Sequence, residues 1–156
     1  MALARETARR STCVRRSVGA VLLDGRGHVV GTGYNGVAAG RPHCNDVVFK
    51  DQTFAGWDPA DLDETVVERP HACPGWDRPM GQSGGACQAV HAEQNALLQC
   101  RDPWAVRSCY VTVSPCVPCA KVLLNTSCER VVFAEESHHA EAEDLWTSAG
   151  RLWVRL

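Results

Sequence analysis

Two short clusters of metal-binding side chains constrain this chain more than any other feature. The first is His91-Ala-Glu93, and the second is Pro115-Cys116-Val-Pro-Cys119. One imidazole and two thiolates suit Zn²⁺, which takes four ligands in structural sites and keeps one position open in catalytic sites. Three protein ligands therefore predict a site with a free position for water. They also require a fold that brings the two clusters together.

The spacing within each cluster indicates where helices begin. Cys116 and Cys119 stand three residues apart at the start of an expected helix, so both sulfurs face one point and the positive helix end favours their thiolate forms. His91 and Glu93 would diverge by about 200° inside a helix, so both reach one metal only in an open first turn. The alternative is that the cysteines are small buried residues and the His91 cluster is a solvated helix end.

Glu93 is predicted to move protons and not to bind the metal. Zinc lowers the pKa of a bound water towards ~7, and a carboxylate beside that water can take its proton and pass it to a substrate. The sequence therefore predicts Glu93 as the general acid and base.

Hydrophobic periodicity predicts an α/β domain. Two β-branched runs, residues 18–23 and 28–34, flank Asp24-Gly-Arg-Gly27 and indicate a hairpin. Downstream, a helix is expected over residues 88–99, a strand over 109–113, a helix over 117–126, a strand over 130–134, a helix over 139–149 and a strand over 152–155. A hairpin followed by alternating helices and strands predicts a mixed sheet with helices on both faces.

A long insertion interrupts this pattern at about residues 36–86, which are rich in Gly, Pro, Asp and Trp and show no clear periodicity. A chain of 156 residues has the length of one domain. We therefore expect a single domain over residues 1–156 with this insertion.

Composition excludes several classes of protein. Sixteen Lys and Arg against eighteen Asp and Glu give a net charge of −2, which provides no positive field for long nucleic acid. The apolar runs are far shorter than the ~20 residues that span a bilayer, and the charged start does not resemble a signal peptide. Nine cysteines, an odd number, favour metal-binding or catalytic thiols over disulfides. We therefore expect a cytoplasmic location.

Four blocks in order resemble the deoxycytidylate (dCMP) deaminases of the cytidine deaminase-like superfamily. They are CVRRSVGAV (13–21), GYNGVAAG (33–40), VHAEQNAL (90–97) and YVTVSPCVPCAK (110–121), and they include the H-x-E and P-C-x-x-C signature of zinc nucleobase deaminases. The resemblance implies a three-layer α/β/α fold with a five-stranded mixed sheet. It also implies zinc-dependent hydrolysis of dCMP to dUMP with release of ammonia, a small nucleotide as substrate, and a homo-oligomer.

The resemblance assigns a role to each of several residues. It implies His91, Cys116 and Cys119 as zinc ligands, Glu93 as proton shuttle, Asn35 as the deoxyribose contact, and the backbone around Ala92 and Ser114 as the contact for the cytosine edge. The alternative for Asn35 is a turn residue in a left-handed conformation. The candidates for a phosphate contact are Arg15, Arg16, Arg41 and Lys121, each of which is otherwise an ordinary solvated charge.

A second, structural zinc is also implied, because some related deaminases use one to tie the insertion to the core. Cys13 and Cys44 match two such ligands by their places in the blocks, and Cys87 with Cys73 or His71 would complete the set. The alternative is that these thiols are unligated and pack as small hydrophobic residues. Cys100, Cys109 and Cys128 are expected in the core.

Two other functions remain open at this point. One is deamination of another small amino-heterocycle, such as a cytosine nucleoside, a modified cytosine nucleotide or a specialised metabolite. The other is a catalytically inactive, zinc-stabilised binding module. Glu93 argues against the module, because a purely structural site needs no carboxylate beside its ligands.

Overall fold

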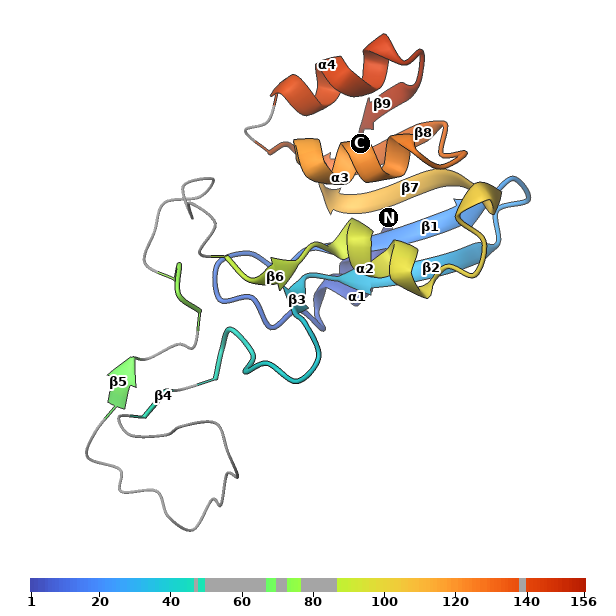
Figure 1. The fold of residues 1–156 in the computed structure, drawn as a ribbon. Coiled ribbons are helices and arrows are strands. Elements are labelled where there is room, and N and C mark those ends of the chain that lie inside the picture. Colours follow the sequence, from blue (N-terminus) through green and yellow to red (C-terminus); the bar gives the residue numbers. More distant parts are fainter. Residues whose placement is uncertain (47, 50–66, 70–72, 77–86, 138–139) are drawn as a thin grey trace.

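A five-stranded mixed sheet forms the centre of the molecule (Figure 1). The computed structural model describes residues 1–46, 48–49, 67–69, 73–76, 87–137 and 140–156. The strands are β1 (Gly19–Asp24), β2 (Val29–Tyr34), β7 (Val106–Val113), β8 (Arg130–Glu135) and β9 (Leu152–Arg155), in the order β2-β1-β7-β8-β9. β1 pairs antiparallel with β2 and β7, whereas β7, β8 and β9 run parallel. The expected mixed sheet is confirmed.

The predicted hairpin connects β1 to β2. The Asp24 carboxylate accepts hydrogen bonds from the backbone N–H groups of Arg26 and His28, both at 2.8 Å. Gly27 takes a φ of 85°, in the left-handed region that glycine adopts without steric cost. An aspartate at the start and a glycine at the end therefore close this turn.

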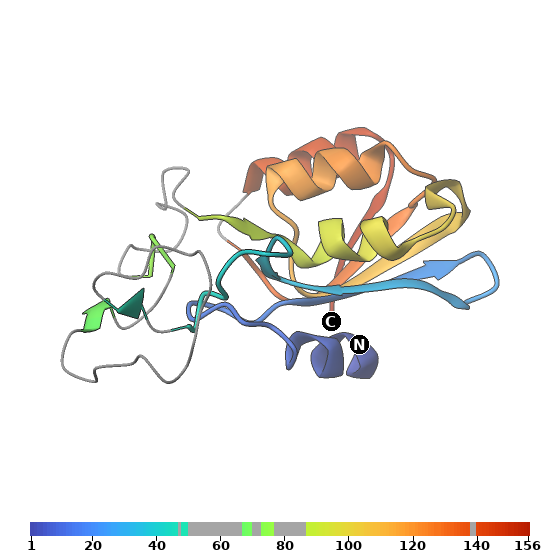
Figure 2. The ribbon, with the colours of Figure 1, turned by 60° about the horizontal axis from the view of Figure 1, so that its bottom comes forward.

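Helices cover both faces of the sheet (Figure 2). They are α1 (Ala2–Ala8) on one face, and α2 (Ala92–Gln99), α3 (Val117–Leu124) and α4 (Ala140–Ser148) on the other. A Cβ atom at Gly19 would lie 2.4 Å from the Ala8 nitrogen of α1, while one at Gly33 would lie 2.3 Å from the Ala92 oxygen of α2. Gly33 pairs with Ala20, the next residue after Gly19, and successive residues of a strand point to opposite faces. The three layers follow from this alternation.

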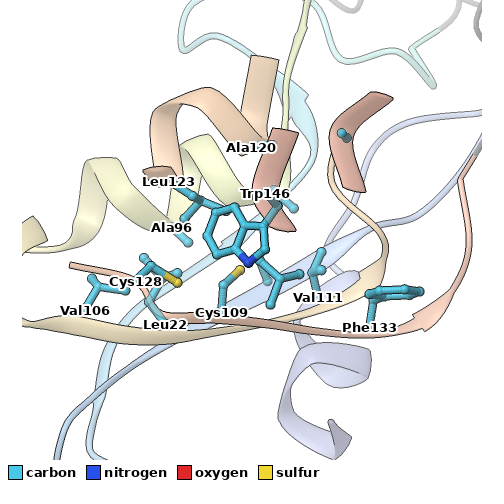
Figure 3. Packing of buried hydrophobic residues seen from close by; sticks show 14 of the residues in the cluster. Leu22, Ala96, Val106, Cys109, Val111, Ala120, Leu123, Cys128, Phe133 and Trp146 are labelled. Carbon is cyan, nitrogen blue, oxygen red and sulfur yellow. The ribbon is translucent and has the colours of Figure 1, made fainter. Parts of the chain in front are cut away.

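The main apolar cluster lies between the sheet and the helices α2, α3 and α4 (Figure 3). Trp146 of α4 is fully buried in it, and its indole N–H donates to the Leu152 oxygen at 3.0 Å. Cys100, Cys109 and Cys128 also belong to this cluster, which confirms their expected place in the core.

Several elements differ from the sequence-based expectation. The helix expected from residue 88 begins only at Ala92, because Ala89–Val90 form strand β6, paired with β3 (Gly36–Val37). Helix α1 was not expected, since its two buried residues are alanines, which give a weak hydrophobic pattern. A short 3₁₀ helix, Pro103–Ala105, precedes β7.

Besides β3, two further short strands are described within the expected insertion. They are β4 (Val48–Phe49) and β5 (Val67–Arg69), which pair antiparallel. Most of the remaining insertion lies outside the described residues. Within the part of the chain that the structure describes, no helix combines the length and apolar character that crossing a bilayer requires.

Candidate metal centre

Helix α2 begins at the first metal-binding cluster. Gly36 pairs with Val90, and the next residue, His91, is the N-cap of α2 with extended backbone angles (φ −75°, ψ 159°). The Gln94 side chain accepts the His91 backbone N–H at 3.0 Å, and the Asn95 amide donates to the Tyr34 oxygen at 2.7 Å. His91 therefore lies at a helix start that is anchored to the sheet, as predicted.

Helix α3 begins at the second cluster. Cys116 is its N-cap, again with extended angles (φ −77°, ψ 168°), and Cys119 lies in its first turn. Pro118 fits this turn because its missing N–H would have no partner within the helix. β7 ends at Val113, so the sheet leads almost directly into the cysteine cluster.

The two helix starts bring His91, Cys116 and Cys119 together. His91 Nδ1 lies 3.3 Å from Cys116 Sγ and 3.4 Å from Cys119 Sγ. Zinc bonds of ordinary length in a tetrahedron would separate a nitrogen and a sulfur ligand by about 3.6 Å. Among the described residues, this is the one group of three or more candidate ligands whose donor atoms all lie within 4.8 Å of one another. The donor set and its spacing fit zinc.

Glu93 lies beside this group without belonging to it. Its side chain is 4% exposed, and burial is the main cause that raises the pKa of its carboxyl group. The Cys119 thiol is a hydrogen-bond partner of this carboxyl group. A carboxyl group with a raised pKa can both accept and return a proton near neutral pH.

The two thiols differ in acidity. A hydrogen bond from Cys119 is the largest of the influences that lower the pKa of Cys116 to about 4, and His91 adds to it. The same hydrogen bond, with burial and the neighbouring Glu93, raises the pKa of Cys119. Metal binding displaces such a proton.

The predicted substrate contacts lie at the same sheet edge as the metal group. Asn35 follows β2 and is 8% exposed, and Ser114 follows β7 and is 5% exposed. Ala92 is fully buried at the first position of α2. The β2 and β7 ends share one edge because β1 is antiparallel to both strands.

Asn35 already has partners within the protein. Its Oδ1 accepts hydrogen bonds from Ser11 Oγ at 2.7 Å and the Val18 N–H at 2.8 Å, and its Nδ2 donates to the Arg16 oxygen at 2.8 Å. An amide group has two N–H donors, so one remains for a ligand. Sequence reasoning missed this role of Asn35 in holding residues 11–18.

The four candidate phosphate contacts lie in different surroundings. Arg16 pairs with Glu135 at 2.7 Å, and Arg41 donates to the Gln88 side chain at 3.3 Å. Lys121 lies exposed on α3, and Arg15 is partly buried before β1. The ion pair between Arg16 and Glu135 joins segments far apart in the chain, and the sequence pattern gave no signal for it.

Cys44 interacts electrostatically with each of the three other cysteines expected around a second zinc. Cys44 and Cys73 are both 3% exposed. Burial is the largest cause that raises the pKa of Cys44 to about 12, followed by the neighbouring Cys73, Cys13 and Cys87. His71, the alternative ligand, lies outside the described residues.

A site that offers zinc three side chains leaves one position for water, and the buried carboxyl group beside it can move protons of that water. This chemistry, on a mixed sheet with helices on both faces, defines a zinc-dependent deaminase. The chain belongs to the cytidine and deoxycytidylate deaminase family. The family profile described as "Cytidine and deoxycytidylate deaminase zinc-binding region" matches residues 1–135.

Individual relatives support this assignment. The deoxycytidylate deaminase of Mycobacterium phage D29 is 36% identical over 140 residues, covering 88% of this chain and 92% of the relative. ComE operon protein 2 of Bacillus subtilis (strain 168) is 31% identical over 154 residues, covering 96% and 65%. The structure of dCMP deaminase from the cyanophage S-TIM5, in complex with dCMP and dUMP, superimposes with a TM-score of 0.67 at 20% identity, covering 99% of this chain and 92% of that one. This last likeness shows a shared fold.

Proposed function

We propose that this protein hydrolyses dCMP to dUMP and releases ammonia. The observation that carries the proposal is the convergence of His91, Cys116 and Cys119 beside the buried Glu93. The relatives named deoxycytidylate deaminase point to dCMP as the substrate.

His91, Cys116 and Cys119 would hold the zinc ion, which supplies Lewis-acid chemistry that makes water a nucleophile near neutral pH. Glu93 takes a proton from the attacking water and delivers it to N3 of the cytosine. The oxygen of that water bonds to C4; Glu93 then takes the proton of the new C4 hydroxyl group and passes it to the C4 amine. The C4–N bond breaks, ammonia leaves, and the C4 carbonyl of dUMP is formed. Burial suits Glu93 to this task because it raises the pKa of the carboxyl group towards the working pH.

The substrate contacts remain part of the proposal. The remaining N–H of Asn35 would donate to the deoxyribose, and the backbone around Ala92 and Ser114 would hold the cytosine edge. Support comes from their position, since all three residues lie at the sheet edge where the metal group is formed.

An ammonia-release assay tests the function. The substrates are cytosine, deoxycytidine, CMP, dCMP, dCTP and 5-methyl-dCMP, and we expect dCMP to be turned over most efficiently. Cys119→Ala should abolish turnover and remove one zinc per chain in metal analysis. An active wild type without zinc or a comparable metal would contradict the mechanism. Turnover of deoxycytidine in preference to dCMP would favour a nucleoside deaminase.

We further propose that Cys13, Cys44, Cys73 and Cys87 bind a second, structural zinc. The burial of Cys44 and Cys73 and the electrostatic contact of Cys44 with all three other thiols support this set. The four thiols are more widely spaced than the first group, and zinc would draw them together. Such a site would attach the insertion to the residues before β1.

The organisation of the whole chain completes the proposal. We propose a single domain with its insertion at about residues 36–86, assembled as a homo-oligomer in the reducing cytoplasm. None of the nine cysteines, all of which lie in the described part of the chain, forms a disulfide, which suits a reducing compartment. Light scattering coupled to size exclusion measures the assembly state.

A further inference from the structure

The ion pair between Arg16 and Glu135 spans the sheet edge that carries the proposed substrate contacts. Arg16 Nη2 lies 2.7 Å from Glu135 Oε2. Arg16 precedes β1 and Glu135 ends β8, while β7 lies between these two strands. Adjacent strands are about 4.8 Å apart, so the pair reaches across two strand spacings, or about 10 Å. It therefore crosses the end of β7, where Ser114 leads towards the cysteine cluster.

The Glu135 side of this pair holds Ser114 directly. The Ser114 N–H donates to the backbone carbonyl oxygen of Glu135 at 2.8 Å. The Ser114 hydroxyl donates to Ser137 Oγ at 2.9 Å and accepts from the Ser137 N–H at 2.7 Å. Glu135 and Ser137 thus fix Ser114 through three hydrogen bonds.

The Arg16 side of the pair holds Asn35. The Arg16 oxygen accepts the Asn35 amide at 2.8 Å, and the Asn35 Oδ1 accepts the Val18 N–H at 2.8 Å. One continuous set of contacts therefore runs from Asn35 through Arg16 and Glu135 to Ser114. It joins the residue proposed to contact the sugar to the residue proposed to contact the base.

We propose that Arg16 and Glu135 are positioning residues that set the distance between Asn35 and Ser114 for substrate binding. This inference rests on the proposed function of the site. Their contribution to the stability of the fold should be small, because exposed ion pairs contribute little, and the Glu135 side chain is 68% exposed. Their effect should instead appear in the KM for substrate.

A double-mutant cycle tests the proposal. Arg16→Ala and Glu135→Ala should each lower kcat/KM for dCMP about tenfold, mainly through KM, and the double variant should lose about the same tenfold. Glu135→Asp, which keeps the charge, should restore part of the loss.

Glu136→Ala is the matched control, because Glu136 is the next residue and pairs with Arg155 at 3.0 Å. Its kinetics should equal those of the wild type, and all variants should keep the wild-type zinc content and melting temperature.

The main competing explanation is that Arg16 itself binds the phosphate of dCMP. In that case Arg16→Ala alone would impair dCMP turnover, and Glu135→Ala would leave it unchanged or improve it. Losses that multiply to about a hundredfold in the double variant would also overturn the proposal. Turnover of dCMP by the wild type tests the proposed function independently of the double-mutant cycle. If another compound of the panel is the true substrate, the same cycle is measured with that compound.

Discussion

At the residue scale, the metal ligands could be predicted from their spacing along the chain. The residues that hold the proposed substrate contacts could not, because they lie in distant segments. The sequence shows both pairs because each pair shares one helix start. Cys116 and Cys119 are three residues apart, and His91 and Glu93 are two residues apart. The partners of Asn35 and Ser114 lie in other segments. No pattern in a single sequence reveals such pairs, so Ser137 and Glu135 could not be predicted.

Replacing Glu93 should separate metal binding from chemistry. In Glu93→Gln the carboxamide keeps the size of the side chain but cannot carry the proton, while the three ligands remain. We expect wild-type zinc content and a kcat lower by about 10²–10⁴-fold. Metal analysis and steady-state kinetics with dCMP measure both. Glu141→Gln, on the exposed surface of α4, is the control and should be fully active. Turnover close to the wild-type rate in Glu93→Gln would remove this residue from the mechanism.

At the element scale, the order of strands and helices follows from hydrophobic periodicity, whereas the start of α2 does not. Ala89 and Val90 continue the apolar pattern of α2, yet they pair with β3, because hydrogen bonds to Gly36 and Val37 place them in a strand. Such pairing between distant segments overrides local periodicity. Gly33 of β2 permits the close approach of α2, because a Cβ atom at this position would meet the backbone of that helix.

Gly33→Ala should therefore displace α2 from the sheet. The new Cβ would lie 2.3 Å from both the Ala92 oxygen and the Ala96 nitrogen, which are backbone atoms that cannot rotate away. We expect destabilisation by about 1–3 kcal/mol, as for overpacked cores, together with weaker zinc retention. Urea unfolding and metal analysis after dialysis measure these effects. In the control Gly25→Ala, the new Cβ meets only the Arg107 side chain at 3.6 Å, an ordinary contact. Equal stability of the two variants would contradict the steric argument.

At the scale of the whole molecule, the sequence between residues 36 and 86 shows no periodicity that would predict a core of its own. Long segments without periodicity are uncommon in compact domains. Cys44 and Cys73 are buried although they lie within this segment, and Cys44 interacts electrostatically with Cys73 and with Cys13, which precedes β1. A shared metal would explain why these thiols are buried together.

Cys44→Ala tests this second zinc. The wild type should contain two zinc ions per chain, and the variant should contain one, with a lower melting temperature, because a metal bound only by the folded state stabilises it. Cys100→Ala is the control, since Cys100 is a buried thiol of the main apolar cluster that lies away from the group. It should keep both ions. A fully active wild type with a single zinc per chain would exclude the second site.

Preference for a 5′-monophosphate is a further property of the whole chain, whose net charge of −2 supplies no general attraction for anions. A preference for the phosphate must therefore come from local cations. Besides Arg16, which pairs with Glu135, the candidates are Arg15, Arg41 and Lys121. A charge-assisted hydrogen bond contributes roughly 1.5–3 kcal/mol, so loss of the phosphate should lower kcat/KM about ten- to a hundredfold. Part of this difference should fall with added salt, because exposed charges are screened.

The measurement is the ratio of kcat/KM for dCMP to that for deoxycytidine at low and high ionic strength. A ratio near one at low salt would reject the phosphate contact and favour a nucleoside substrate, and it would leave the assignment of His91, Cys116 and Cys119 unchanged.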